Sequence, residues 1–219
     1  FNQEFKSMSL LKALKKLHFP NGTYEDAMDE YVLAKQRVAF EEIYLHKHEF
    51  LKTVEKFNKK KSFELMINKE SMDIFYSSLP FSLTSGQISA INKISNSIRD
   101  KKPSKVLIQG DVGCGKTIVA IIACYQALKN NHQCLVLVPT EVLCSQHFKT
   151  FTEYLCNYGM VEMISGKNTK AEKESIKNKL YDGQISVLIG THALLFNDYK
   201  FRSLAIVIID EQHKFGIKQ

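Results

Sequence analysis

The sequence predicts an α/β fold in which a doubly wound, mostly parallel sheet is preceded by an α-helical segment. Three observations lead to this prediction. Residues 23–79 contain neither glycine nor proline and carry apolar residues at helical spacing. After Pro80, short apolar runs alternate with amphipathic runs of helical length, and one apolar run leads into a glycine-rich loop over 110–117. We therefore divide the chain into a helical arm over 1–80 and an α/β lobe over 81–219.

Two helices are expected in the arm. A leucine-rich stretch over 10–17 predicts a short amphipathic helix, and Pro20-Asn-Gly22 predicts the turn that follows it. A long helix is expected over 23–58, because apolar residues recur there on one helical face. These apolar residues are Leu33, Phe40, Ile43, Tyr44, Leu51, Val54 and Phe57. Such a stripe is expected to pack against the lobe or against a neighbouring part of the protein.

The lobe is expected to alternate helices with strands. The helices are assigned to residues 84–100, 116–130, 140–157 and 170–181. The strands are assigned to residues 105–109, 134–138, 160–164, 185–189 and 204–209. These strand segments are short, apolar and rich in β-branched residues, as buried strands of a parallel sheet are.

The glycine-rich loop reads Gly110-Asp-Val-Gly-Cys-Gly-Lys-Thr117, which has the spacing of a phosphate-binding loop. Its glycines let backbone N–H groups curl around phosphate oxygens, and the following helix adds the positive end of its dipole. Lys116 is expected to reach the β- and γ-phosphates, and the Thr117 hydroxyl to bind Mg²⁺. The residues predicted to bind the nucleotide here are Gly110, Asp111, Val112, Gly113, Cys114, Gly115, Lys116 and Thr117.

Two acidic residues follow the last apolar run. Asp210 and Glu211 come directly after the strand predicted over 204–209. Ligands gather at the carboxyl ends of parallel strands, so Asp210 is expected to hold Mg²⁺, directly or through water. Glu211 is expected to orient or deprotonate the attacking water.

Composition sets broader limits. The net charge is +7, and residues 81–219 contribute +6 of it, with 17 basic and 11 acidic residues. This excess fits a nucleic-acid partner and equally fits a lysine-rich solvated surface. The five cysteines contain no C-x-x-C pair, which indicates a reducing, cytoplasmic setting without a metal–thiolate site. Cys114, at a helix start, is expected to be reactive. Because the sequence begins Phe1-Asn-Gln rather than with Met, we expect a fragment of a longer protein.

With these segments placed, the chain resembles the first motor lobe of superfamily 2 helicases, most closely those of the RecG family. Motifs along nearly the whole chain carry this resemblance. In the lobe they are Phe81-Ser-Leu-Thr-Ser-Gly-Gln87, the phosphate loop, Val138-Pro-Thr-Glu-Val-Leu143, Ile189-Gly-Thr-His-Ala-Leu194 and Ile209-Asp-Glu-Gln-His-Lys-Phe-Gly216. The last motif discriminates best, since RNA helicases of the DEAD class carry Asp where this chain has His213.

The resemblance implies a RecA-like lobe, ATP as the nucleotide, and roles for residues outside the phosphate loop. Gln87 would hydrogen-bond the adenine edge, and His213 would couple the ATP site to DNA. Two loops would grip the nucleic-acid backbone. Their residues are Pro139 and Thr140 in one loop and Gly190, Thr191 and His192 in the other.

The resemblance also implies partners. It predicts an ATP-dependent helicase acting on branched or forked duplex DNA, with a wedge domain before this chain and a second motor lobe after it. Without the arginine finger of that second lobe, this chain is expected to bind Mg·ATP and hydrolyse it poorly. Two alternatives stay open: a superfamily 2 motor acting on RNA or another polymer, and a nucleotide-binding module without activity of its own.

Overall fold

The computed structural model describes residues 8–19, 22–191, 194 and 198–212, and it divides into two compact units, Phe1–Lys60 and Lys61–Gln219. The boundary at Lys60/Lys61 lies ahead of the one predicted at Pro80. Residues 61–80 therefore belong to the second unit rather than to the helical arm. The reason is packing: side chains of this segment lie in the core of the lobe, as described below.

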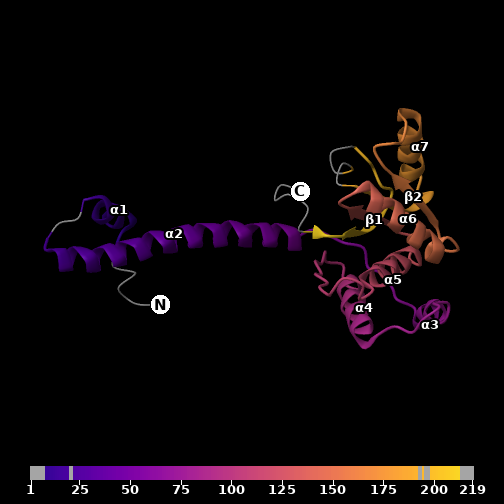
Figure 1. Ribbon diagram of the computed structural model, residues 1–219, viewed down its shortest axis with the longest axis horizontal. Coiled ribbons are helices and arrows are strands. Elements are labelled where there is room, and N and C mark those ends of the chain that lie inside the picture. The colour runs from indigo at the N-terminus through magenta and orange to yellow at the C-terminus, as the bar shows by residue number, and fades with distance from the viewer. Residues whose placement is uncertain (1–7, 20–21, 192–193, 195–197, 213–219) are drawn as a thin grey trace. The chain divides into compact units, whose positions relative to one another are not determined.

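The first unit is a pair of helices, α1 (Leu10–His18) and α2 (Tyr24–Asn58), as the sequence predicts (Figure 1). Ser9 caps α1 by accepting a hydrogen bond from the backbone N–H of Lys12. Helices α1 and α2 pack against each other, and Ala13 of α1 and Ala34 of α2 are both fully buried. Their small side chains let the backbones approach closely.

The second unit is built on a four-stranded parallel sheet in the order β2-β3-β1-β4. Its strands are β1 (Gln133–Val138), β2 (Met160–Ile164), β3 (Ile185–Thr191) and β4 (Leu204–Ile209). Its helices are α3 (Lys69–Ser77), α4 (Ser85–Ile98), α5 (Lys116–Leu128), α6 (Glu141–Leu155) and α7 (Lys170–Tyr181). The predicted helices and these strands begin and end within two residues of their expected positions, and the predicted α/β fold class is confirmed.

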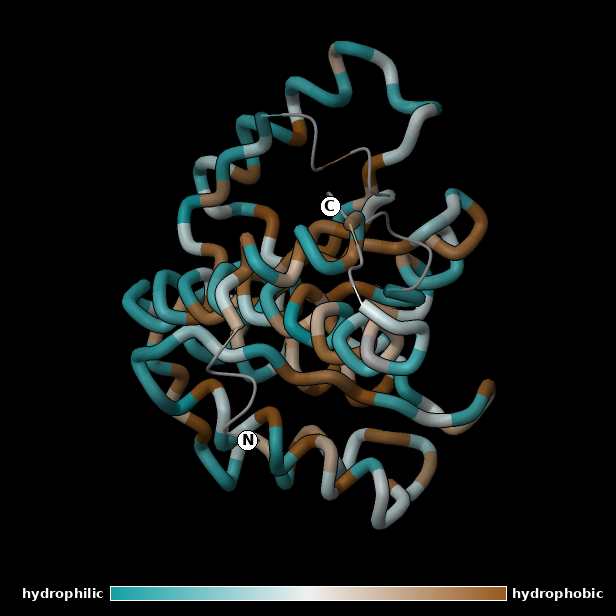
Figure 2. Tube along the Cα trace, turned by 90° about the vertical axis from the view of Figure 1, so that its left-hand side faces the viewer, coloured by the Kyte–Doolittle hydropathy of each residue, from teal (hydrophilic) through white to brown (hydrophobic). Residues whose placement is uncertain are grey.

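Apolar side chains cover both faces of this sheet. Every residue of β1 is buried, as expected for a central parallel strand. One cluster joins β1 and β3 to α3, α5 and α6, and a second joins the sheet to α7. Helices at the surface alternate between polar and apolar stretches, visible as teal and brown in Figure 2. Because all four strands are parallel, their carboxyl ends lie at one edge of the sheet, where the loops discussed below begin.

The predicted strand over 105–109 is wrong: these residues belong to no strand of the described sheet. Val106 and Leu107 are exposed, and only Ile108 packs against the core. An apolar run becomes a strand only where a neighbour supplies ladder hydrogen bonds, and that depends on the whole sheet. Strand β4 is therefore the last strand of the described sheet on its side, and its Val207 and Ile209 side chains are nearly half exposed.

Helix α3 was not predicted. Asn68 caps it by accepting a hydrogen bond from the Ser71 N–H, and its buried residues are Met72 and Phe75. Phe75 stacks on Tyr125 of α5 with ring centroids 4.3 Å apart. This contact ties residues 61–80 to the lobe. The helices within the described ranges all lack the combination of length and apolar character that a membrane span requires.

Candidate nucleotide and nucleic-acid site

Three loops of interest leave the sheet at the same edge. Val138, the last residue of β1, is in register with Thr191 of β3, and Leu137 is in register with Ile209 of β4. The backbone N–H of Asp210 continues this ladder by donating to the Leu137 carbonyl at 2.9 Å. The loops after β1, β3 and β4 therefore start side by side, as the positions of their motifs predict.

The phosphate loop turns through two glycines in the left-handed region, Gly113 (φ +83°) and Gly115 (φ +80°). This backbone conformation is readily adopted by glycine and is strained for most other residues. Gly115 is the N-cap of α5, which begins at Lys116. The first N–H groups of a helix have no partner within it, so the loop and helix together present donors suited to phosphate oxygens.

The Lys116 ammonium folds back over this loop. Its Nζ donates to the carbonyl oxygens of Gly110 at 2.7 Å and Asp111 at 2.8 Å. Loop residues 110–114 are exposed, whereas Lys116 and Thr117 are half-buried. The positive charge of Lys116 is thus held against the first residues of the loop rather than extended into solvent.

Gln87 joins the start of α4 to the phosphate loop. Its Oε1 accepts from the Thr84 N–H at 2.9 Å, completing a capping box. Its Nε2 donates to the Cys114 carbonyl at 3.1 Å. A Cβ at Gly115 would lie 2.4 Å from this Nε2, so glycine is also what permits the approach. The amide keeps one donor hydrogen and one acceptor lone pair for another partner.

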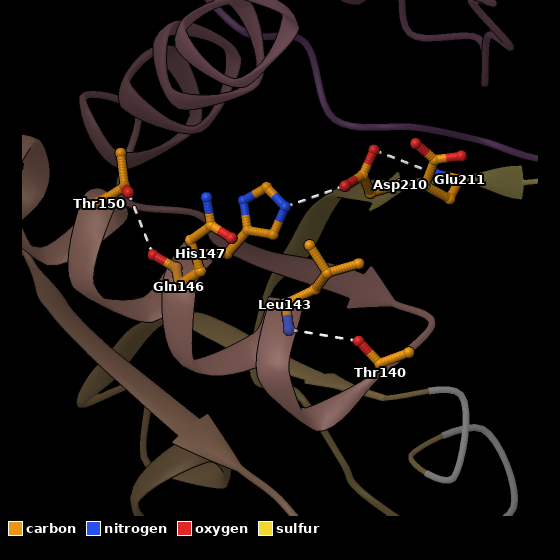
Figure 3. Close-up of polar contacts among 7 residues, drawn as sticks. All are labelled: Thr140, Leu143, Gln146, His147, Thr150, Asp210 and Glu211. Atoms are coloured by element: carbon orange, nitrogen blue, oxygen red, sulfur yellow. Dashed lines mark hydrogen bonds and ion pairs between the residues drawn. The ribbon is translucent and has the colours of Figure 1, made fainter. Parts of the chain in front are cut away.

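A second polar cluster surrounds Asp210 (Figure 3). Its Oδ1 accepts from the Glu211 N–H at 3.0 Å, and its Oδ2 lies 2.9 Å from Nε2 of His147 on α6. Glu211 has a left-handed backbone (φ +51°), which is uncommon for a residue with a side chain. Strained backbone of this kind gathers at functional sites.

The structure does not connect the two clusters directly. In the described part of the chain, no hydrogen bond or ion pair joins Lys116 to Asp210. Instead, both are carried by one packed unit, in which α5 packs against β4 and β1. Lys116 is the first residue of α5, and Asp210 comes directly after the last residue of β4.

The other predicted residues lie at the sheet edge. Thr140, after Pro139, caps α6 by accepting from the Leu143 N–H at 3.3 Å (Figure 3). A Cβ at Gly190 would lie 3.0 Å from the backbone oxygen of Ile164 and 2.4 Å from Leu194, so a larger residue would disturb the end of β3. Thr191 is half-buried. His192, predicted to grip the nucleic-acid backbone, and His213, predicted to couple the ATP site to DNA, lie outside the described residues.

Sequence reasoning missed His147. Its partner Asp210 is 63 residues away, and α6 gives no local pattern that singles out one polar side chain. The only available signal is its place on the helix that follows the Pro139–Thr140 loop.

Comparison with known proteins gives consistent matches. The DEAD/DEAH box helicase family matches residues 84–219. The ATP-dependent DNA helicase RecG of Aquifex aeolicus is 36% identical over 219 residues, covering 99% of this chain and 28% of that protein. RecG of Thermotoga maritima is 38% identical over 215 residues, covering 98% of this chain and 27% of that protein.

Comparison with solved structures also finds helicases. A structure of RecG bound to a three-way DNA junction matches with a TM-score of 0.75 and 35% identity, covering 99% of this chain and 30% of that one. The UvsW helicase from bacteriophage T4, with a TM-score of 0.51 and 19% identity over 76% of this chain and 60% of its own, shows the shared fold. This chain spans less than a third of the length of the RecG relatives. The family match covers the phosphate loop and Asp210-Glu211, and the chain belongs to the DEAD/DEAH box helicase family.

Proposed function

We propose that this chain is the ATP-binding lobe of an ATP-dependent DNA helicase that remodels branched DNA, such as forks and junctions. The observation that carries the proposal is the match, over 99% of the chain, to RecG in a structure with a three-way DNA junction. The length of the relatives supports two further partners within one protein, a second motor lobe and a DNA-binding wedge domain. The basic excess of residues 81–219 supports a polyanionic partner.

The phosphate loop fits the triphosphate of ATP. Gly113 and Gly115 provide the left-handed turns that direct N–H groups inward, and the exposed loop leaves room for phosphate oxygens. Lys116 exchanges its two carbonyl acceptors for the β- and γ-phosphate oxygens. The Gln87 side chain is already fixed by hydrogen bonds to Thr84 and Cys114, and it uses its remaining amide N–H and lone pair to hydrogen-bond the adenine edge.

The acidic pair fits Mg²⁺ and an attacking water. Hard oxygen donors suit Mg²⁺, and the chain offers the Thr117 hydroxyl and the Asp210 carboxylate. When bound, the ion neutralises charge that develops on the transferred phosphoryl group. Asp210 is held rigidly, because its backbone continues the β4–β1 ladder and both carboxylate oxygens have hydrogen-bond partners. Glu211 orients the water and accepts its proton.

The neighbouring loops fit a nucleic-acid backbone. Thr140 follows β1 and Thr191 is the last residue of the adjacent, paired β3, so both loops start at the same edge of the sheet and offer hydroxyls and N–H groups there. Backbone contacts of this type position a protein on DNA without reading its sequence. Pro139 and Gly190 shape these loops. By their motifs alone, we assign His192 to the loop that grips the nucleic-acid backbone and His213 to coupling of the ATP site to DNA.

The proposal is tested by ATP turnover of a longer protein that joins this lobe to the other domains of its relatives. Forked DNA is expected to stimulate turnover more than linear duplex, single strands or RNA. Lys116→Ala is expected to lower turnover by about 10²–10³-fold, the usual loss when a donor to developing charge is removed. Lys129→Ala, at the exposed C-terminal end of the same helix, is the matched control and should leave turnover unchanged.

Other outcomes point elsewhere. Equal stimulation by RNA would favour a different superfamily 2 motor. ATP binding without turnover under any condition would favour a nucleotide-binding module.

Alkylation of Cys114 is expected to block ATP binding, because the added group would stand inside the loop beside Lys116, 3.9 Å from the sulfur. Cys114 and Cys156 are exposed, whereas the other three cysteines are buried. Burial and the nearby Glu141 raise the pKa of Cys144 to about 11, which keeps that thiol unreactive. A Cys156→Ser variant treated with iodoacetamide should lose ATP affinity in step with modification. Unchanged affinity after complete modification would contradict the expectation.

A further inference from the structure

His147 contacts the proposed metal ligand through a well-formed hydrogen bond. Its Nε2 lies 2.9 Å from Oδ2 of Asp210, and the side chains are 12% and 31% exposed. Figure 3 shows the imidazole pointing from α6 toward the end of β4. Because an ionised carboxylate only accepts hydrogen bonds, Nε2 carries the proton in this contact. The imidazole is therefore a donor aimed at one oxygen of Asp210.

The imidazole is itself held in place. Helix α6 is anchored at its start by the Thr140 cap, and His147 lies near the end of its second turn. One turn further on, Phe151 is fully buried and its ring meets the imidazole edge-on, with centroids 5.9 Å apart at 74°. A side chain fixed by both backbone and packing can hold a partner in one orientation.

This contact leaves the carboxylate usable for a metal. Each carboxylate oxygen has about two lone-pair sites. His147 occupies one site on Oδ2, and the Glu211 N–H occupies one on Oδ1. One site remains on each oxygen, and the plane of the carboxylate is fixed by two donors, one from α6 and one from the backbone of the next residue. Donors of this kind keep a metal ligand in its productive orientation.

We propose that His147 is a positioning residue for Asp210: its Nε2–H fixes the carboxylate so that the remaining lone pairs meet Mg²⁺ bound with ATP. The inference rests on the proposed function, because it presumes that Asp210 serves the metal. It adds a residue from α6, outside the phosphate loop and the acidic pair, to the nucleotide site. It also makes α6 a direct link between the Pro139–Thr140 loop and the metal ligand.

The test compares three variants of this chain by binding of a fluorescent ATP analogue. His147→Phe keeps an aromatic ring against Phe151 and removes the N–H. His147→Gln keeps a donor, since its amide nitrogen is as many bonds from Cβ as Nε2 is. Gln146→Ala changes an exposed neighbour on the same helix and serves as the control.

The quantity compared is the Mg²⁺ concentration that gives half of the metal-dependent gain in nucleotide affinity. His147→Phe is expected to raise it by about 10–100-fold, the usual cost of losing an outer partner of a metal ligand. His147→Gln is expected to restore most of the loss, and Gln146→Ala to match the unaltered chain. In an Asp210→Asn background, His147→Phe should have no further effect.

Nucleotide affinity in EDTA separates the inference from the function on which it rests. It should be the same in all His147 variants and should fall in Lys116→Ala. Failure of the unaltered chain to bind nucleotide would overturn both proposals. Normal binding with an unchanged Mg²⁺ requirement in His147→Phe, or an equal loss in the Phe and Gln variants, would overturn the role of His147 alone.

A metal-free readout completes the test. Nitrogen-15 NMR of the unaltered chain should show His147 protonated at Nε2, and the resonance should shift in Asp210→Asn. An imidazole signal indifferent to that substitution would contradict the contact. Should His147→Phe fail to fold, His147→Asn replaces it, because its shorter amide cannot reach the Asp210 carboxylate.

Discussion

Glu211→Gln is expected to lower ATP turnover by about 10²–10⁴-fold while ATP remains bound, because an amide cannot accept the proton of the attacking water. Gln has nearly the same size, so the left-handed backbone at this position and the N–H contact to Asp210 are kept. The measurement is steady-state turnover of the longer protein with saturating forked DNA, paired with nucleotide affinity.

Glu174→Gln is the matched control. Glu174 lies on α7 with its side chain 67% exposed, and its only described ion pair is at 4.0 Å to Lys177. Turnover should be unchanged in this variant. If Glu211→Gln turned over ATP like the control, Glu211 would not be the residue that handles the water.

Phe75→Ala is expected to lower the free energy of unfolding of the second unit by about 3–5 kcal/mol. Phe75 is buried between Tyr125, at 4.3 Å, and Tyr158, at 5.9 Å between ring centroids. Its removal leaves a cavity that a helix fixed by the Tyr125 hydroxyl to the Ser71 carbonyl cannot easily close. Urea denaturation followed by tyrosine circular dichroism gives the difference.

The neighbouring Ile74→Ala provides the comparison, since Ile74 is 65% exposed on the other face of α3. Its effect should stay within about 0.5 kcal/mol, as is usual for surface substitutions. Equal effects of the two substitutions would mean that residues 61–80 do not belong to the core of the lobe, and would restore the boundary predicted at Pro80.

Much of the lobe could be predicted from sequence because its signals are local. Strands β1 to β4 are apolar runs with turn residues around them, and the phosphate loop has a fixed spacing of glycines ahead of Lys116. The signals for helix starts are also local, since Thr84 and Thr169 each form a capping box with the residue three positions later in the chain. In each case the information lies within a few residues of the element.

The failures share the opposite property. Residues 105–109 carry the same apolar signature as a strand, but a strand also needs a neighbour, which no local pattern supplies. Helix α3 has only two buried residues, Met72 and Phe75, too few to show a period. The contact of His147 with Asp210 joins distant parts of the chain. Each depends on tertiary placement rather than on propensity.

The central position of β1 has a consequence for synthesis of the protein. Cys134 pairs with Val187 on one side and with Ile206 on the other, so the partners of β1 follow it by 187 − 134 = 53 and 206 − 134 = 72 residues. At about 5–20 residues per second, the ribosome needs roughly 4–14 s to deliver the second partner. Throughout that interval β1, every residue of which is buried in the folded lobe, has an unpaired edge. Nascent chains stalled between β1 and β4 are therefore the stage at which a holding chaperone protects this protein most.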